Sequence, residues 1–492
     1  MRFCAHLPPT VPFPRPLLLL WLLLAVPLAW SVGVDADLFF HVLTGLRILA
    51  DGAVPPVDAW SFTAAGSPWM NHQWLTQLLL GWLWQNAGNP GLLLYRMIAF
   101  LGTAWALGAA VWKRCPDPLW STVLFAFPLA FYAQLINLRP QSVTYLGTAL
   151  VLLLLTDLRR RRAWPALALI LLFPLWANMH AGFLFGLGIA AAGVLALHLD
   201  GTLNRFPTLL LLGVPALLTL ANPEGIYLWQ YIFKEFGAPH IDLPEWNPPQ
   251  GILLYITLGT LILPLLAAWK RRSPPSLDEW FGLLCSVFMT LRGARFIIFA
   301  VMFAAVTLAT ALGSRSEPGS TTPAPVSGTS RYRLVSFCFA LICIIAFLRP
   351  FMGLPGRIPI DAARYPLGSV KYLRETSGQA RLWTPLGWGG IVLFHLSDRI
   401  KVSLDGRNTT VYPIDFVVRQ ARAGAEGNAS AVLDLAPDLI LTETGGPLDR
   451  ALRLHSSVTL IQSDSVGSLF ARTGFQMASG TPVPPPALEF PW

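Results

Sequence analysis

The sequence predicts a polytopic α-helical membrane protein that carries a separate α/β domain in its C-terminal part. Of the 492 residues, 54% are hydrophobic and only 12% are charged, a composition typical of a membrane protein. Long apolar runs recur up to about residue 352, and short strand-like and helix-like stretches alternate after it. The runs predict a transmembrane domain over 1–352, and the alternation predicts an α/β domain over 353–473.

The apolar runs are long enough, or nearly long enough, to cross a bilayer. They predict about eleven transmembrane helices, at 17–34, 91–112, 119–136, 141–156, 164–179, 181–199, 207–221, 251–269, 280–291, 296–312 and 334–351. The stretch 75–87 is shorter and contains Trp82 and Trp84. We interpret it as a helix that lies in the membrane interface.

The formal charge of +9 does not indicate nucleic-acid binding, because the basic residues flank apolar runs. Under the positive-inside rule such clusters mark cytoplasmic loops; they lie at 113–114, 159–162, 205 and 270–272. The Pro-, Ser- and Gly-containing linker 314–333 is then cytoplasmic as well. The first loop, 34–90, and the C-terminal domain are then expected on the opposite, outer side of the membrane.

The C-terminal domain is expected to contain a largely parallel sheet. Its predicted strands are 380–384, 401–404, 438–442, 458–462 and 468–471, and its predicted helices are 368–376, 413–423, 429–435 and 448–454. The glycines in 387–390 are interpreted as turn residues, while Asp405 and Arg407 follow a strand and could belong to a site. The Pro-rich segment 474–492 is predicted to be disordered.

The first outer loop concentrates acids, histidines and aromatic residues. Asp35 and Asp37 lie two residues apart near His41, so either carboxylate could act as a general base, and both could hold Mg²⁺ or Mn²⁺. The alternative is that one of them caps the helix that follows. Further along, His72 and Trp74 could line a saccharide or phosphate site, although a tryptophan here is also typical of an interfacial anchor.

Polar breaks between later spans supply further candidates on the same outer side. Asn137–Gln141 contains Arg139, Asn178–Gly182 contains His180, and 292–295 contains Arg292 and Arg295. Ionisable groups near membrane depth are costly, which favours a functional interpretation, and arginines suit a phosphate. Solvation of loops and helix capping is the alternative for each break taken alone. P-loop, GxSxG, HExxH and GxGxxG contexts are absent from the sequence.

The first outer loop also contains an extended motif. It reads D-x-D-x-F-F-H, then G-x-x-I-L-x-x-G-x-x-P-x-x-D-x-W-S-F-T-x-x-G-x-P-W, then H-x-W-L, between Asp35 and Leu75. This pattern resembles bacterial multi-pass membrane proteins of the GT-C glycosyltransferase superfamily, which are similar to dolichyl-phosphate-mannose–protein mannosyltransferases and lipid A sugar transferases. The resemblance continues at 178–183, 222–223, 245–246, 365–366, 387–390 and 405–407. Gln73 departs from the glutamate that often follows the second histidine in that group.

The resemblance implies a GT-C-like fold and transfer of a hexosyl or pentosyl group from a polyprenyl-phosphate sugar lipid. An outer-loop aspartate, Asp37 with Asp35 beside it, would be the catalytic base. His41, His72, Trp74, Arg139, His180, Arg292 and Arg295 are the expected substrate-binding residues. The alternatives are a non-catalytic assembly or sensor protein and a transporter of a lipid-linked substrate. The sequence identifies no protein partner.

Overall fold

The computed structural model describes residues 8, 11–15, 21, 25, 34–135, 137–237, 246–313, 357–484 and 488–492. The chain divides into two compact units that are each built from separate stretches. Unit 1 comprises Met1–Ser31, Leu94–Trp229 and Asp242–Met352, and unit 2 comprises Val32–Leu93, Gln230–Ile241 and Gly353–Trp492. The expected linker 314–333, the expected span 334–351 and most of the expected span 17–34 lie outside the described residues.

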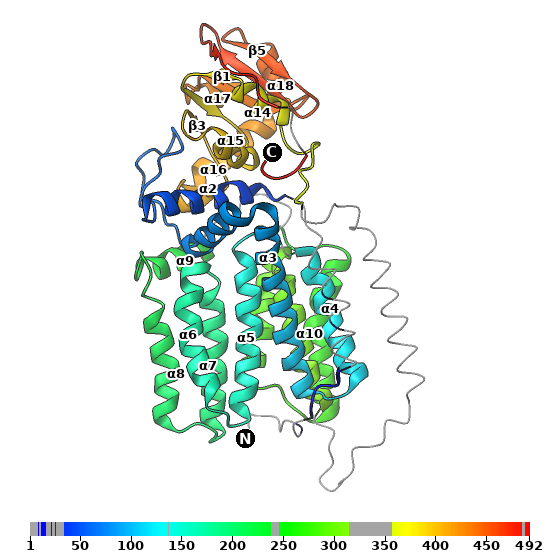
Figure 1. The fold of residues 1–492 in the computed structure, drawn as a ribbon. Helices are drawn as coiled ribbons and strands as arrows, with labels where there is room; N and C mark the ends of the chain where they lie inside the picture. Colours follow the sequence, from blue (N-terminus) through cyan, green and yellow to red (C-terminus); the bar gives the residue numbers. More distant parts are fainter. Residues whose placement is uncertain are drawn as a thin grey trace. The chain divides into compact units, whose positions relative to one another are not determined.

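Unit 1 is a bundle of apolar helices, among which α5, α6, α7 and α8 run side by side (Figure 1). Its helices are the later part of α3 (Trp74–Arg114), α4 (Pro118–Leu135), α5 (Gln141–Arg159), α6 (Trp164–Met179), α7 (Phe183–Leu199), α8 (Arg205–Leu218), α10 (Ile252–Arg271), α11 (Leu277–Arg292) and α12 (Ile297–Gly313). Helix α12 is apolar on all sides and buried along most of its length, as expected for a central helix.

Within the described residues, four helices are long and apolar enough, by length and composition, to cross a membrane. They are Trp74–Arg114, Gln141–Arg159, Ile252–Arg271 and Ala294–Gly313, and shorter apolar helices occupy other expected spans. The apolar helical character of this part is therefore confirmed. The number of about eleven spans stays a prediction.

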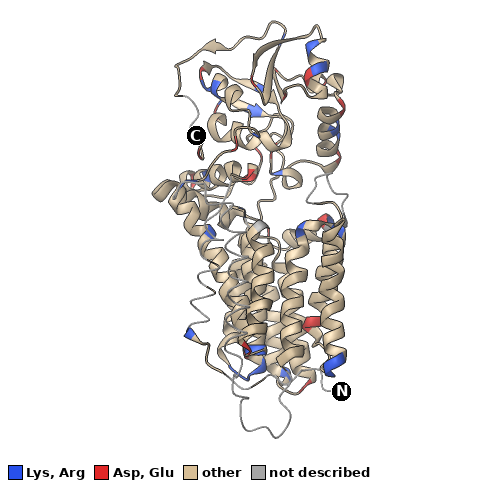
Figure 2. Cartoon of the chain, turned by 90° about the vertical axis from the view of Figure 1, so that its right-hand side faces the viewer, with Lys and Arg blue, Asp and Glu red and all other residues tan. Residues whose placement is uncertain are grey.

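Basic residues at the ends of the bundle helices are partly neutralised by buried acids. Lys113 Nζ lies 2.7 Å from an Asp157 carboxylate oxygen, and Arg159 pairs with Asp278 in the first turn of α11. Figure 2 shows most Lys and Arg residues of the helical part near the helix ends, while the flanks of the bundle are mostly uncharged. The basic clusters therefore have a structural role as well: besides predicting the orientation in the membrane, they form ion pairs between neighbouring helices.

Unit 2 contains a five-stranded mixed sheet with the order β3-β2-β4-β6-β5. The strands are β2 (Ala380–Trp383), β3 (Ile400–Val402), β4 (Leu439–Glu443), β5 (Val458–Ser463) and β6 (Gly467–Arg472). Strand β2 pairs in parallel with β3 and β4, whereas β6 pairs antiparallel with β4 and β5. The expected largely parallel sheet is thus only half parallel, because β5 and β6 are joined by a short turn, which permits only antiparallel pairing.

Helices cover both faces of this sheet. The short helices α16 (Ile414–Glu426), α17 (Ala429–Leu433) and α18 (Pro447–Arg453) pack on the face that presents Trp383, Ile440 and Phe470. Helix α14 (Leu367–Arg374) packs on β5 and β6. Burial on both faces explains why Leu439–Leu441 reads as a continuous apolar run rather than as an alternating one.

Two helices from the first outer loop belong to unit 2. Helix α2 (Ala36–Asp51) ends at Gly52, whose φ of 66° suits glycine. It crosses the first half of α3 backbone to backbone, since a Cβ on Gly45 would lie 1.9 Å from the carbonyl oxygen of Gln77. Non-helical angles at Gly88 break α3 (φ 57°, ψ −141°), so the helix expected at 75–87 is separate from the span after it. Its place at a membrane interface stays a prediction.

The glycines at 387–390 correct one interpretation. They lie in helix α15 (Leu386–Leu396), and none of them has a positive φ. For Gly389 and Gly390 the role is close packing rather than turn formation: a Cβ on Gly389 would lie 2.3 Å from the Leu404 carbonyl oxygen, and one on Gly390 would lie 2.9 Å from that of Ala36. Helix α15 therefore packs directly on α2 and on the chain after β3.

The segment 474–492, expected to be disordered, is ordered where the structure describes it. Strand β7 (Ala478–Ser479) pairs antiparallel with β1 (Thr376–Ser377). Phe490 is 2% exposed and packs against Phe39 and Trp84. Aromatic residues between the prolines supply the burial that a Pro-rich composition alone does not suggest.

Candidate functional site

The two aspartates of the first outer loop have different surroundings. Asp35 is the N-cap of α2, and its carboxylate accepts a hydrogen bond of 3.0 Å from the backbone N–H of Asp37. The capping interpretation therefore holds for Asp35. Asp37 is half-buried in the first turn, and its Oδ1 lies beside Gly406, where a Cβ would be 2.4 Å away. The fold thus brings Asp37 to the Asp405-Gly406-Arg407 loop.

Next to this loop lies a small polar cavity of about 50 Å³, lined by Phe40, Trp69–Gln73, Gln77, Gly406, Arg407 and Thr410. Asn71 and Gln77 are buried, and among the described residues Asn71 Nδ2 and Gln77 Oε1 have no hydrogen-bond partner. One atom is a donor and the other an acceptor. The cavity therefore suits a group that both accepts and donates, such as a hydroxyl or ordered water.

The two predicted histidines of the loop flank this cavity from buried positions. His41 Nδ1 lies 3.3 Å from Gln77 Nε2, and its ring centroid is 4.1 Å from that of Phe40. His72 lines the cavity, and its ring packs against Tyr231 at 5.7 Å. Desolvation lowers the pKa of His72 to about 4, so this imidazole is neutral at pH 7. Trp74 is half-buried at the start of α3.

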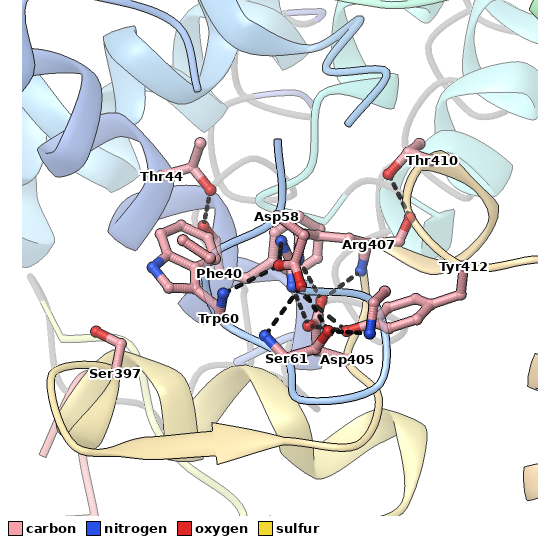
Figure 3. Close-up of polar contacts among 12 residues, drawn as sticks. Phe40, Thr44, Asp58, Trp60, Ser61, Ser397, Asp405, Arg407, Thr410 and Tyr412 are labelled. Carbon is pink, nitrogen blue, oxygen red and sulfur yellow. Dashed lines mark hydrogen bonds and ion pairs between the residues drawn. The ribbon is translucent and has the colours of Figure 1, made fainter. Parts of the chain in front are cut away.

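A buried ionic cluster, consisting of Asp58, Asp405, Arg407 and Tyr412, joins the first outer loop to the C-terminal stretch of unit 2 (Figure 3). Arg407 Nη1 lies 2.6 Å from Asp58 Oδ1, and Arg407 Nε and Nη2 donate to the two oxygens of Asp405 at 2.8 and 2.7 Å. Asp58 also accepts hydrogen bonds from Ser61 Oγ and from the N–H groups of Trp60 and Ser61. The cluster thus holds the first outer loop and the 405–412 stretch together.

Electrostatics keep this cluster charged. Burial opposes ionisation of Asp58, but Arg407 and the hydrogen bonds outweigh it, so the pKa of Asp58 lies below its usual value. Desolvation and the Asp405 carboxylate raise the pKa of Tyr412 well above its usual value, and its hydroxyl donates to Asp405 Oδ2 at 2.7 Å. The guanidinium also lies 5.0 and 4.9 Å from the rings of Trp60 and Trp69, within cation–π range.

The sequence left Asp405 and Arg407 open and assigned no such role to Asp58. Backbone pairing explains why they meet: Val402 N–H donates to Trp60 O at 3.1 Å, and Phe62 N–H donates to Val402 O at 3.0 Å. The outer loop thereby extends the edge of the sheet beside β3. A single sequence does not show that these two segments are in contact. It shows only the two turns separately, the Asp-x-Trp-Ser turn and the Asp-Gly-Arg turn.

Helix α9 (Tyr227–Gly237) was not anticipated by the sequence analysis. From this helix the Tyr231 hydroxyl lies 3.2 Å from Thr409 Oγ1, and Thr409 donates to Glu235 at 2.9 Å. These contacts place α9 against the chain that follows Arg407. Its pattern of aromatic residues with Lys234 and Glu235 on a helical period was the available signal.

The candidate residues of unit 1 lie at one end of the bundle. Thr144 at the start of α5 contacts His180 Nδ1 at 2.7 Å, and the Gly182 N–H donates to the same nitrogen at 3.0 Å. Because Nδ1 accepts, the neutral ring carries its proton on Nε2. The Arg139 carbonyl caps this region by accepting from Ser142 Oγ at 2.8 Å, and the Arg139 side chain is half-buried.

Arg292 is the last residue of α11 and Arg295 follows it. Both lie at the same end of unit 1, because Phe299 near the start of α12 packs against Tyr145 of α5 and Phe185 of α7. The Arg295 guanidinium lies 4.3 Å from the Trp246 ring centroid. Arg292 is exposed at the end of α11. The structure thus places Arg139, His180 and Arg295 at one end of unit 1, and Asp35, Asp37, His41, His72 and Trp74 within unit 2.

Within the parts of the chain that the structure describes, no group of three or more His, Cys, Asp or Glu side chains could hold a metal ion. The carboxylate of Asp35 is already engaged as a helix cap. A cation at Asp35 and Asp37 therefore stays a prediction, and it would need ligands from a bound substrate or water.

Comparison with known proteins gives the fold. No family model and no curated protein sequence matches the chain. Two structures of the oligosaccharyltransferase AglB from Archaeoglobus fulgidus are similar, one of them with an inhibitory peptide and a dolichol-phosphate and the other in the apo form. Their identities are 11% and 10% and their TM-scores 0.54 and 0.55, with coverage of 87% of this chain and 69% of AglB.

A structure of ArnT from Cupriavidus metallidurans bound to undecaprenyl phosphate is also similar, at 13% identity and a TM-score of 0.48, with coverage of 93% of this chain and 96% of ArnT. The TM-scores of the AglB structures are higher, and they identify the fold. At these identities the likeness concerns the fold. The resemblance that begins in the Asp35–Leu75 motif is thereby confirmed at that level, and this chain has the fold of a GT-C glycosyltransferase.

Proposed function

We propose that this protein is a membrane glycosyltransferase that moves a sugar from a polyprenyl-phosphate-linked donor to an acceptor of the cell envelope. The observation that carries the proposal is the fold likeness to AglB, one of whose structures contains a dolichol-phosphate. Apolar helices long enough to cross a membrane agree with a lipid-linked donor. The proposed location is the bacterial inner membrane, with the first outer loop and the C-terminal domain on the outer side.

Asp37 is the proposed general base. Asp35 is engaged by the backbone of α2, whereas Asp37 lies beside Gly406 and near the polar cavity. Its carboxylate would take the proton from an acceptor hydroxyl as the oxygen attacks the anomeric carbon and the bond from that carbon to the lipid phosphate breaks. Attack opposite the leaving group inverts the configuration at that carbon. The cavity would hold a hydroxyl of the substrate.

The leaving lipid phosphate needs cationic groups and hydrogen-bond donors. Arg139, Arg292, Arg295 and His180 of unit 1 are proposed for this role. His180 is suited because its Nδ1 is occupied by Thr144 and Gly182, which leaves Nε2 as the donor of the neutral ring. Arg295 is partly held by the ring of Trp246, which limits its freedom before a phosphate binds.

The test is transfer of sugar from polyprenyl-phosphate donors by purified Asp37→Asn, with Asp51→Asn as the matched control. Asp51 lies on the same helix, and its carboxylate pairs with exposed Arg47 at 2.6 Å. Loss of a general base typically lowers the rate by about 10²–10⁴-fold, so we expect Asp37→Asn to fall in that range and Asp51→Asn to match wild type. A folded Asp37→Asn protein with wild-type transfer would refute the role of Asp37.

Mass spectrometry of lipids that co-purify with the protein tests the donor class separately. We expect a polyprenyl-phosphate species to be enriched over the bulk membrane lipids. Its absence, combined with no transfer from any polyprenyl-phosphate sugar, would favour a non-catalytic role for the chain.

A further inference from the structure

Unit 1 contains a cavity of about 480 Å³ whose walls are mostly aromatic and aliphatic. Pockets that bury small organic ligands have about 300–1,000 Å³ and similar walls. Trp105 and Ala109 of α3 line one side, and Phe125 of α4 lines another. A space of this size and character beside an apolar bundle suits a hydrocarbon chain.

The aromatic walls are fixed by specific contacts. Trp21 stacks on Phe125 at 4.1 Å and donates from Nε1 to Thr122 Oγ1 at 3.2 Å. Phe13 packs edge-on against Trp21 and Trp112, with centroids 4.9 and 5.1 Å away. The cavity is thus built from side chains that hold one another in place.

Three cationic side chains, Lys113, Arg160 and Arg162, line the same cavity. The buried carboxylate of Asp157 lies 2.7 Å from Lys113 Nζ and 3.6 Å from Arg162 Nη1, so one acid pairs with two of the three bases. Arg160 Nη2 donates to the carbonyl oxygens of Lys113 and Pro8 at 2.6 and 3.1 Å. Its buried Nε has no acceptor among the residues that the structure describes. The cavity therefore combines apolar walls with excess positive charge.

We propose that this cavity binds an anionic phospholipid, with an acyl chain along the aromatic walls and the phosphate at Arg160 and Arg162. Basic pockets between membrane helices, on the side that the positive-inside rule assigns to the cytoplasm, suit anionic head groups. A zwitterionic phospholipid offers the same chain but no net charge. Charge therefore identifies the occupant more closely than shape does.

This site is distinct from the proposed donor site. Arg160 follows the C-terminal end of α5, whereas Arg139 and Thr144 mark its N-terminal end. A helix of 19 residues is about 28 Å long at 1.5 Å per residue. The phospholipid site therefore does not depend on the proposed sugar transfer, and it would remain if that function were refuted.

Native mass spectrometry of the full chain, exchanged into mixed micelles with equal phosphatidylglycerol and phosphatidylcholine, tests the proposal. We expect wild type to retain phosphatidylglycerol preferentially. Arg160→Gln with Arg162→Gln should lower that preference, by roughly fivefold for each arginine removed. Lys270→Gln with Arg272→Gln removes two exposed charges from the C-terminal end of α10, outside the cavity lining, and should leave the preference unchanged.

A second variant tests the chain-binding part without a change of charge. Ala109→Phe places a ring in the cavity and should reduce retention of the lipid while the protein stays monodisperse. Equal retention of both lipids by wild type would mean annular lipid only and would overturn the proposal. It would also be overturned if the arginine variants and Ala109→Phe both retained phosphatidylglycerol as wild type does.

Discussion

Units 1 and 2 are assembled in different ways. In unit 1 the helices from α3 to α8 follow one another through short turns. Most of its packed helix pairs are close in sequence, although α4 also packs on α12 and α7 on α11. Both units join three stretches of sequence. In unit 2, however, segments far apart in sequence contact each other directly: Lys401 Nζ donates to the carbonyl oxygen of Ala59 across 342 positions of sequence. Apolar burial dominates unit 1, while unit 2 relies at its junction on a buried ionic cluster. Loss of one partner of this cluster is therefore expected to destabilise unit 2, because the remaining charges would stay buried.

Among the variants of unit 2, removal of Arg407 should destabilise this unit the most. In Arg407→Leu, Asp58 and Asp405 remain buried without their cation, and breaking such a pair costs about 3–5 kcal/mol. Limited proteolysis of the purified protein should then cleave unit 2 first and leave the helices of unit 1 protected. Arg381→Leu is the matched control, because the Arg381 side chain that pairs with Asp438 is about half exposed and surface pairs contribute about 0–1 kcal/mol.

Equal protection of unit 2 from proteolysis in Arg407→Leu and Arg381→Leu would contradict a stabilising role of the buried ionic cluster. Arg407→Lys refines the test, since lysine keeps the charge but cannot form the two-pronged contact with Asp405. We expect its proteolytic protection to fall between those of wild type and Arg407→Leu.

Acid should also act on unit 2, through His72. Its pKa is lowered to about 4 by burial, against about 6.5 in an unfolded chain. Between these values the unfolded state binds a proton that the folded state does not, so stability is complete above about pH 6.5 and is lost as the pH falls towards 4. The shift corresponds to a loss on the order of 3 kcal/mol.

The measurement is urea-dependent proteolysis of unit 2 at pH 7 and pH 4.5, for wild type and His72→Phe. Phenylalanine keeps a ring against Tyr231 but cannot titrate, so we expect a smaller loss of protection in acid. His395 is also buried, with a pKa lowered to about 4 by burial and by Arg374. It therefore adds a loss of the same sign, and His72→Phe reduces the acid effect without abolishing it. An unchanged acid effect in His72→Phe would contradict this assignment.

The sequence predicted unit 1 better than unit 2, for a physical reason. An apolar run of sufficient length specifies a helix in a membrane without reference to its partners, so the expected run 164–179 coincides with α6. In unit 2 the five strands were located, but not their mixed pairing. Strand direction depends on connections and distant contacts, which hydrophobic periodicity does not encode.

The candidate site was predicted to a similar, partial extent. Asp35, Asp37, His41, His72 and Trp74 were selected because acids and histidines are dense in the first outer loop, and the structure places all of them in unit 2. Asp405 and Arg407 of the partner loop were left open as site residues, and helix α9 was not predicted. Their proximity to Asp37 and His72 arises from the pairing of Trp60–Phe62 beside β3, a contact between segments that one sequence does not link.

The glycines of α15 give the smallest and most local test of unit 2. In Gly389→Ala the new Cβ would lie 2.3 Å from the Leu404 carbonyl oxygen and 2.8 Å from Asp405 Cα. The backbone must shift, and overpacking of this kind typically costs about 1–3 kcal/mol.

Gly387→Ala is a matched control on the same helix, because nothing lies within 4 Å of its Cβ position. There alanine should instead stabilise the helix by up to about 1 kcal/mol. Urea-dependent proteolysis of unit 2 should therefore shift in opposite directions for the two variants. A shift in the same direction would mean that helix propensity, rather than contact between α15 and the chain before Gly406, sets the stability of this junction.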